Sequence, residues 1–235
     1  AVVAARLTVH AQGVPIEPSA VGAADVSLAT RVVSGSASVP SAGAGRAVAA
    51  GDLYSCALTT TGGVACWGIN DAGQLGNGTH TDSETPVQVL GLSSGVVAIS
   101  TGAVHACALL RDGAVRCWGY NGSGELGDGT LVESAVPVPV VGLGAEVIAL
   151  AAGSMHTCAL TSGGGVKCWG ANGLGQLGNG VFVDSVTPVD VFGLTSGVTA
   201  ISSGESHVCA LTDFGGLRCW GNNDNGQLGN VSTRN

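Results

Sequence analysis

The chain has 235 residues, of which 45% are hydrophobic and only 10% are charged, and its formal net charge is −8 at pH 7. This composition excludes a disordered chain, and eight Lys and Arg residues are too few for a broad nucleic-acid-binding surface. No apolar run reaches the roughly 18 residues of a membrane-spanning helix, so we expect no membrane insertion.

Residues 1–46 form the first part of the chain and carry no repeat. Residues 6–10 and 26–32 partly alternate polar and apolar side chains, which predicts two strands. Residues 34–45 are small and flexible, as in a linker. We interpret this part as the end of an upstream β-rich domain with a linker; the alternative is that its strands complete a neighbouring repeat. The chain has no initiating Met and stops inside a repeat, so we expect it to be a piece of a longer protein.

A 51-residue repeat begins at residue 47. Its copies are 47–97, 98–148 and 149–199, with a partial copy at 200–235. The copies share two cysteines, Cys56 and Cys66, Cys107 and Cys117, Cys158 and Cys168, and Cys209 and Cys219. A tryptophan follows each second cysteine, namely Trp67, Trp118, Trp169 and Trp220. Four copies without an insertion indicate a repeat architecture in which neighbouring units stack.

Each copy has the pattern of a small antiparallel sheet. In the second copy, β-rich runs predict strands at 96–100, 105–109 and 114–118, and the Asp112-Gly113 pair predicts a hairpin turn. A glycine-rich turn at 121–129 precedes residues 137–141, whose prolines fit an edge strand. No stretch shows the apolar period of a helix. Because this is the size of one propeller blade, we predict an all-β fold, a β-propeller segment of about four blades that forms a partial propeller or an open arc.

The two cysteines of each copy lie symmetrically about the hairpin turn. Folding the second copy at Asp112 sets Cys107 opposite Cys117, and opposed residues in an antiparallel pair have Cα atoms about 4.5–5.5 Å apart. This separation suits a disulfide, so we predict four: Cys56 with Cys66, Cys107 with Cys117, Cys158 with Cys168, and Cys209 with Cys219. Disulfides favour an extracellular, periplasmic or cell-surface location. The alternative is a cytoplasmic protein whose cysteines are reduced and buried.

Histidines recur two residues before the first cysteine of each copy, as His105, His156 and His207, with Tyr54 at this position in the first copy. A ring of histidines suggests a metal or pH-sensing site, but the 51-residue period places them in separate blades. We therefore expect these histidines, like the four tryptophans, to have structural roles. The sequence has no zinc knuckle and no hydrolase motif, so we predict no metal, no catalytic residue and no enzymatic activity.

Two glycine-rich segments, 122–127 and 173–178, match the G-x-G-x-x-G dinucleotide pattern. That pattern indicates a nucleotide site only between a strand and a helix. Because no helix is predicted after either segment, we interpret both as backbone turns and expect no bound cofactor.

Residues 153–178 resemble the regulator of chromosome condensation repeat, through G-x-x-H-x-x-A-L, a glycine-containing hairpin and W-G-x-N-x-x-G-Q-L-G. The resemblance implies a β-propeller, usually of seven blades, and covers residues 47–235. Members of the family have unrelated functions, such as nucleotide exchange on a small GTPase, ultraviolet reception and β-lactamase inhibition. The paired cysteines resemble those of bacterial exported members. Ala103-Val104 stand where the photoreceptor has Trp and Arg before the histidine, which disfavours light sensing.

The variable stretches of the repeat are 79–84, 130–135 and 181–186, and loops on a rigid scaffold are usual sites of recognition. We therefore predict a non-catalytic, exported or surface-attached propeller that binds a protein or glycan through these loops. The candidate binding residues are Thr79, His80, Asp82, Glu84, Leu131, Glu133, Phe182 and Asp184. The acidic balance favours a basic or neutral partner. The alternatives are a regulator of nucleotide exchange on a small GTPase and an inhibitor of a secreted enzyme. An open arc would also expose a blade face through which the chain self-associates.

Overall fold

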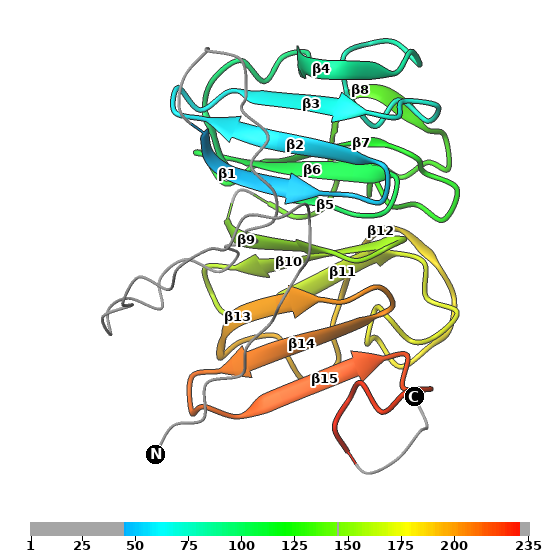
Figure 1. Ribbon diagram of the computed structural model, residues 1–235. Helices are drawn as coiled ribbons and strands as arrows, with labels where there is room; N and C mark the ends of the chain where they lie inside the picture. The colour runs from blue at the N-terminus through cyan, green and yellow to red at the C-terminus, as the bar shows by residue number, and fades with distance from the viewer. Residues whose placement is uncertain (1–44, 145, 231–235) are drawn as a thin grey trace, which may run out of the picture. The chain divides into compact units, whose positions relative to one another are not determined.

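A computed structural model describes residues 45–144 and 146–230 of the chain. The chain divides into two units, residues 1–38 and 39–235. The strands expected at 6–10 and 26–32 lie outside the described residues. In the second unit, the described residues form fifteen strands in four antiparallel sheets, which we call blades 1 to 4 (Figure 1).

Each blade is a meander whose strands pair in chain order. Blade 1 consists of β1 (Gly45–Ala50), β2 (Tyr54–Thr59), β3 (Val64–Gly68) and β4 (Ser83–Gln88). Blade 2 consists of β5 (Val96–Thr101), β6 (His105–Leu110), β7 (Val115–Gly119) and β8 (Ser134–Pro139). Blade 3 consists of β9 (Val147–Ala152), β10 (His156–Thr161), β11 (Val166–Gly170) and β12 (Ser185–Asp190), and blade 4 of β13 (Val198–Ser203), β14 (His207–Thr212) and β15 (Leu217–Gly221).

The all-β propeller segment of about four blades is confirmed. The second strands begin at Tyr54, His105, His156 and His207, so the 51-residue period of the sequence is also the period of the fold. The proline-containing strand of blade 2 begins three residues earlier than predicted, at Ser134. It is the outermost strand of its sheet, where a residue without an N–H group is tolerated.

The blades stack along their first strands to form an open arc. β1 contacts β5, β5 contacts β9, and β9 contacts β13, so the first strand of each blade is the innermost one. The described sheets do not close into a ring. Since the strands run across the arc, all turns lie on one of two faces (Figure 1). The loop face carries the turns between the first and second strands of each blade and the long loops between the third and fourth strands. The hairpin face carries the hairpin turns between the second and third strands and the connections from one blade to the next.

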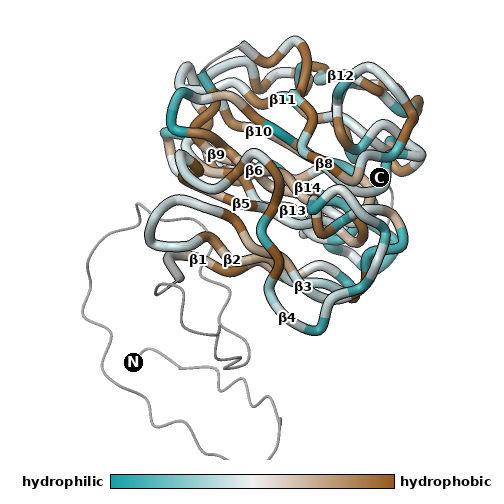
Figure 2. The backbone as a smooth tube through the Cα atoms, turned by 90° about the horizontal axis from the view of Figure 1, so that it is seen from above, coloured by the Kyte–Doolittle hydropathy of each residue, from teal (hydrophilic) through white to brown (hydrophobic). Residues whose placement is uncertain are grey.

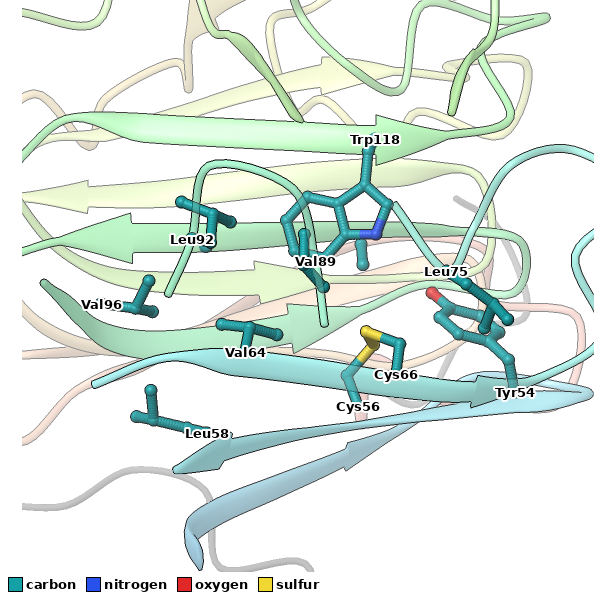
Figure 3. Packing of buried hydrophobic residues seen from close by; sticks show 12 residues of the cluster. Tyr54, Cys56, Leu58, Val64, Cys66, Leu75, Val89, Leu92, Val96 and Trp118 are labelled. Atoms are coloured by element: carbon teal, nitrogen blue, oxygen red, sulfur yellow. A yellow bond between two sulfur atoms is a disulfide. The ribbon is translucent and has the colours of Figure 1, made fainter. Parts of the chain in front are cut away.

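The hydrophobic core lies between successive blades, and Figure 2 shows apolar residues concentrated along the strands. Between blades 1 and 2, Trp118 of β7 packs onto the Cys56–Cys66 pair, Leu75 and Val89 of blade 1 (Figure 3). Trp169 packs in the same way on blade 2, and Trp220 on blade 3. A blade therefore completes its core with the tryptophan of the next blade.

The glycine of each Cys-Trp-Gly triplet is required by close backbone packing. Gly119 has a φ of 103°, a conformation that residues with a Cβ rarely adopt. A Cβ at Gly119 would lie 2.5 Å from the carbonyl oxygen of Val104. The chain therefore leaves the third strand at this glycine and enters the long loop.

Candidate interaction face

The centre of the loop face is formed by the turns between first and second strands, which hydrogen bonds connect across the arc. The amide of Asp52 donates to the carbonyl of Ala103 (3.2 Å), and Ala103 donates to Ser154 (3.1 Å). Ser154 in turn donates to Glu205 (2.8 Å). Backbone bonds thus fix the relative positions of all four turns.

These turns surround an open depression of about 400 Å³. Its lining comes from equivalent positions of the four blades, Ala50, Gly51, Asp52, Thr101, Gly102, Ala103, Ala152, Gly153, Ser154, Ser203, Gly204 and Glu205. The lining side chains are small except for the two carboxylates, so the depression offers little apolar surface to a ligand.

The long loops are organised by a buried asparagine, a role that sequence reasoning missed. The side-chain nitrogen of Asn70 (Nδ2) donates to the carbonyls of Thr79 (2.8 Å) and Thr81 (3.1 Å). Its side-chain oxygen (Oδ1) accepts from the backbone amide of Leu75 (2.9 Å). Asn121 and Asn172 make the equivalent bonds. The sequence feature that marks this role is the asparagine of W-G-x-N, which recurs every 51 residues.

The tryptophans connect each long loop to the next blade. The indole nitrogen of Trp118 donates to the backbone oxygen of Gln74 (2.9 Å), and that of Trp169 to Glu125 (2.8 Å). The indole of Trp220 donates to Gln176 (2.9 Å). A tryptophan of the following blade is therefore hydrogen-bonded to each long loop of blades 1, 2 and 3.

Some of the predicted binding residues belong to this framework. Asp82 accepts from the backbone amide of Asn70 (2.8 Å), and Asp184 accepts from that of Asn172 (2.8 Å). Thr79 supplies a carbonyl to Asn70. These residues shape the loops from within, although all three side chains are exposed.

The other predicted binding residues are presented outward. Leu131 is 59% exposed and Phe182 63% exposed, which is unusual for side chains of this size, and both project from the loop face. Glu84 and Glu133 are exposed as well. His80 is exposed and its Nδ1 lies 3.0 Å from the carbonyl oxygen of Asp71. The loop face thus brings together residues from the three variable stretches.

The repeat histidines His105 and His156 lie at the boundaries between successive blades, whereas His207 is half-buried on blade 4, the last blade described. His105 is buried with its Nε2 2.9 Å from the Thr157 hydroxyl of blade 3. Burial, and then the neighbouring His156, lowers the pKa of His105 to about 3. Burial, and then His207, lowers the pKa of His156 to about 4. Both rings are therefore neutral at pH 7.

Tyr54 occupies the equivalent position of blade 1 and also contacts the next blade. Its hydroxyl donates to the carbonyls of Gly102 (3.3 Å) and His105. Burial, and then the nearby Asp52, raises the pKa of Tyr54 well above its usual value. Tyr54, His105 and His156 thus occupy one repeat position, at which blades 1, 2 and 3 each contact the blade that follows.

Glu125 is the exception in a set of glutamines. Gln74 and Gln176 occupy this position in blades 1 and 3, and each accepts a backbone hydrogen bond from its own loop. Glu125 accepts the equivalent bond from Ser123 (2.9 Å) but is fully buried, and its Oε1 has no hydrogen-bond partner. Burial raises the pKa of its carboxyl group.

The eight cysteines lie in the four predicted pairs. Their sulfur atoms are 2.09–2.12 Å apart, and the Cα atoms of each pair are 4.1 Å apart. Among the residues described, no three His, Cys, Asp or Glu side chains are grouped so as to hold a metal ion. Nor does this part of the chain contain a helix long and apolar enough to cross a membrane.

Comparison with known proteins shows one family. The profile described as the regulator of chromosome condensation (RCC1) repeat matches residues 46–74, 96–125, 147–176 and 198–227, and a second profile of that description matches 61–109, 112–160 and 164–211. The chain is 37% identical over 193 residues to the human "Probable E3 ubiquitin-protein ligase HERC4", covering 80% of the chain and 18% of that protein. It is 35% identical over 185 residues to the ultraviolet-B receptor UVR8 of Arabidopsis thaliana, covering 77% and 42%.

Solved structures agree with this assignment. The crystal structure of human WBSCR16 is similar with a TM-score of 0.73 and 30% identity, covering 82% of the chain and 51% of that protein. Yeast RCC1 (Prp20), in a crystal structure with Kap60 bound, is similar with a TM-score of 0.68 and 30% identity, covering 78% and 44%. The chain therefore spans about half, or less, of each of these relatives.

Proposed function

Since the chain belongs to the regulator of chromosome condensation (RCC1) repeat family, we propose that it is a non-catalytic propeller segment that binds a protein partner through its loop face. The observation that carries this proposal is the contrast between framework and tip in the long loops. The buried Asn70, Asn121 and Asn172 are identical, whereas the exposed tips differ, with His80, Leu131 and Phe182 at one repeat position. Varied side chains on an identical rigid support are typical of recognition loops.

A protein is a better fit to these tips than a glycan. Leu131 and Phe182 expose large apolar side chains, and the buried core of a protein interface is more apolar than the rest of the surface and is enriched in aromatic residues. The relatives support this choice, since the structure of yeast RCC1 (Prp20) holds a bound protein, Kap60. The identity of that partner belongs to the yeast protein and is not transferred to this chain.

The cysteine pairs support an exported or surface-attached protein. All eight cysteines of the chain lie at disulfide distance from a partner, and stable disulfides are rare in the cytosol. We therefore propose that the partner is a secreted or surface protein, which the loop face meets in an oxidising compartment.

The test replaces the tips and leaves the framework intact. The loop-face variant carries His80→Ser, Leu131→Ser and Phe182→Ser. The matched control carries Val97→Ser, Ile148→Ser and Phe192→Ser, at exposed positions near the hairpin-face ends of the strands. Proteins cross-linked to each form in the secreted and surface fraction of the source organism are quantified against the unmodified chain. We expect the loop-face variant to lose the cross-linked partner and the control to keep it. Equal retention by both variants would refute the proposal.

A further inference from the structure

Charge is divided unequally between the two faces of the arc. The loop-face segments and the strand ends beside them carry nine acidic residues that are exposed or half-buried, Asp52, Asp71, Asp82, Glu84, Asp128, Glu133, Asp184, Glu205 and Asp224. Within the described ranges, 45–144 and 146–230, these segments contain no Lys or Arg. In the part of the chain that the structure describes, the carboxylates of the loop face therefore have no Lys or Arg side chain beside them on the same face.

The hairpin face has a different balance. Arg111 lies in a turn of that face, and Arg116, Lys167 and Arg218 are the second residues of the strands that leave it. The acidic residues on this side are Asp112, Glu146, Asp190 and Asp213. One of them forms an ion pair, in which Lys167 Nζ lies 2.6 Å from Asp190 Oδ1. The net negative charge of the described blades is thus concentrated on the loop face.

An apolar island lies within this acidic face. The two residues at each loop tip are polar in blade 1, His80 and Thr81, but apolar in the next two blades. Blade 2 carries Leu131 and Val132, and blade 3 carries Phe182 and Val183, and these four residues are 59–70% exposed. Blades 2 and 3 thus share a feature that blade 1 lacks.

The long loop of blade 2 contacts the outermost strand of blade 3, β12, so the two apolar tips are carried by neighbouring blades that touch on this face. The amide of Gly129 donates to the carbonyl oxygen of Val186 (3.0 Å), which follows the blade 3 tip. A Cβ on Gly124 would lie 2.7 Å from the Cα of Val186. Two neighbouring blades thus carry exposed apolar tips on a face whose charged residues are carboxylates, as in a protein-binding surface with an apolar core and a polar rim.

From this arrangement, and resting on the proposed function, we propose that the loop face binds a cationic protein segment with large apolar side chains between its Lys or Arg residues. The apolar side chains contact Leu131 and Phe182, and the flanking cations lie over the carboxylates. The acidic rim accelerates association and excludes acidic partners. It also disfavours nucleic acids as ligands of this face, because phosphates would meet carboxylates, and the part of the face that the structure describes holds no Lys or Arg.

The test uses three fluorescently labelled peptides of equal length. The first, KKLWLKKGKKLWLKK, has both the cations and the apolar centre; EELWLEEGEELWLEE keeps only the apolar centre, and KKSGSKKGKKSGSKK keeps only the cations. Binding to the full 235-residue chain is measured by fluorescence anisotropy at low and physiological salt. We expect the first peptide to bind at least about tenfold more tightly than the other two, and its Kd to rise about tenfold with salt, because exposed charges are screened. Absence of binding by the first peptide, or equal binding by the first and second, would overturn the proposal.

Variants locate the binding to this face. We expect Asp52→Asn, Glu84→Gln, Glu133→Gln and Glu205→Gln together to weaken the first peptide about tenfold and to reduce its salt dependence, because four rim charges are removed. The control combines Glu146→Gln and Asp213→Asn on the hairpin face, and we expect no change. Leu131→Ser with Phe182→Ser should remove the preference for the first peptide over the third. If the tip variants lose the natural partner but the charge variants keep it, the cationic partner is wrong and the proposed function stands.

Discussion

The indole nitrogen of Trp118 donates to the backbone oxygen of Gln74, 44 residues earlier and in the preceding blade. The same tryptophan packs onto the Cys56–Cys66 pair, so one side chain completes the core of blade 1 and supports its long loop. The loop face is therefore held in place by residues of the blades that follow each loop.

The first prediction concerns this tryptophan. Trp118→Phe should lower the free energy of unfolding by about 2 kcal/mol, because it removes a buried hydrogen bond and part of the packed ring. Trp67→Phe is the matched control, since Trp67 is half-buried, and its effect should be clearly smaller. Urea denaturation without reductant measures both. A loss at Trp67 equal to that at Trp118 would contradict the role of the interblade bond.

The second prediction concerns Glu125. Glu125→Gln should stabilise the chain at pH 7 by about 1–3 kcal/mol, because it replaces a buried carboxylate oxygen without a partner by an amide found in the other blades. The reverse change, Gln176→Glu, should destabilise it. Because folding raises the pKa of Glu125, its carboxyl group favours the folded state below its ordinary pKa, and this contribution is lost as the pH rises through the folded value. The gain from Glu125→Gln should therefore vanish at acidic pH; a gain that is constant with pH would contradict this account.

The third prediction is acid sensitivity caused by the histidines. Folding lowers the pKa of His105 to about 3 and that of His156 to about 4, from the ordinary 6.5. The unfolded chain therefore binds more protons below pH 6.5, and stability should fall by several kcal/mol between pH 6.5 and about 4. Measurements in the Glu125→Gln background remove the opposite contribution of that carboxyl group. His156→Gln should flatten the slope, and an unchanged slope would show that His156 is protonated in the folded chain.

The fourth prediction concerns the cysteines. Each of the four disulfides lowers the intact mass of the unreduced chain by two hydrogen atoms, eight in all. Peptide mapping should link Cys107 to Cys117 and find the equivalent pairs in the other blades. Reduction should destabilise the chain by no more than about 2–3 kcal/mol per bridge, because each closes a short loop. Eight free thiols would remove the support for an oxidising compartment.

The fifth prediction is self-association through blade 4. Leu211, Phe214 and Leu217 are 38%, 96% and 69% exposed on this blade, a large apolar surface for a soluble protein. We expect the purified 235-residue chain to show a mass that rises with concentration in light scattering. Phe214→Ser with Leu217→Ser should restore the monomer mass, whereas Phe192→Ser on the blade 3 to blade 4 connection is the control. A concentration-independent monomer would refute this expectation.

The blade and its hairpin were predictable from the sequence because they depend on local pairing. The nine residues between Cys107 and Cys117 set the hairpin register, and the structure pairs these two cysteines directly. The 51-residue period likewise predicted the number of blades.

Contacts between blades and inside loops were not predictable in this way. The bond from Trp118 to Gln74 joins different copies of the repeat, and no pattern within one copy marks it. The bond that the Asp82 carboxylate accepts from the Asn70 backbone amide was not predicted either, although short acidic side chains commonly bond to backbone amides in turns. Partner binding by Asp82 stays a prediction. The division of charge between faces also required the topology, because acidic residues far apart in the chain lie on one face only after the strands alternate in direction.

Site-specific photo-cross-linking can show whether recognition takes place on the loop face. p-Benzoylphenylalanine is incorporated at position 182, at the apolar tip of blade 3, or at position 192, where Phe192 is 86% exposed on the hairpin face. Position 182 lies in the long loop of blade 3 and position 192 just after the last strand of that blade, and both carry an exposed phenylalanine, so the same side chain reports on the two faces. We expect irradiation in the native environment to give a discrete adduct from position 182 and none from position 192. Adducts from position 192 alone, or equal adducts from both, would contradict the assignment of the loop face as the binding surface.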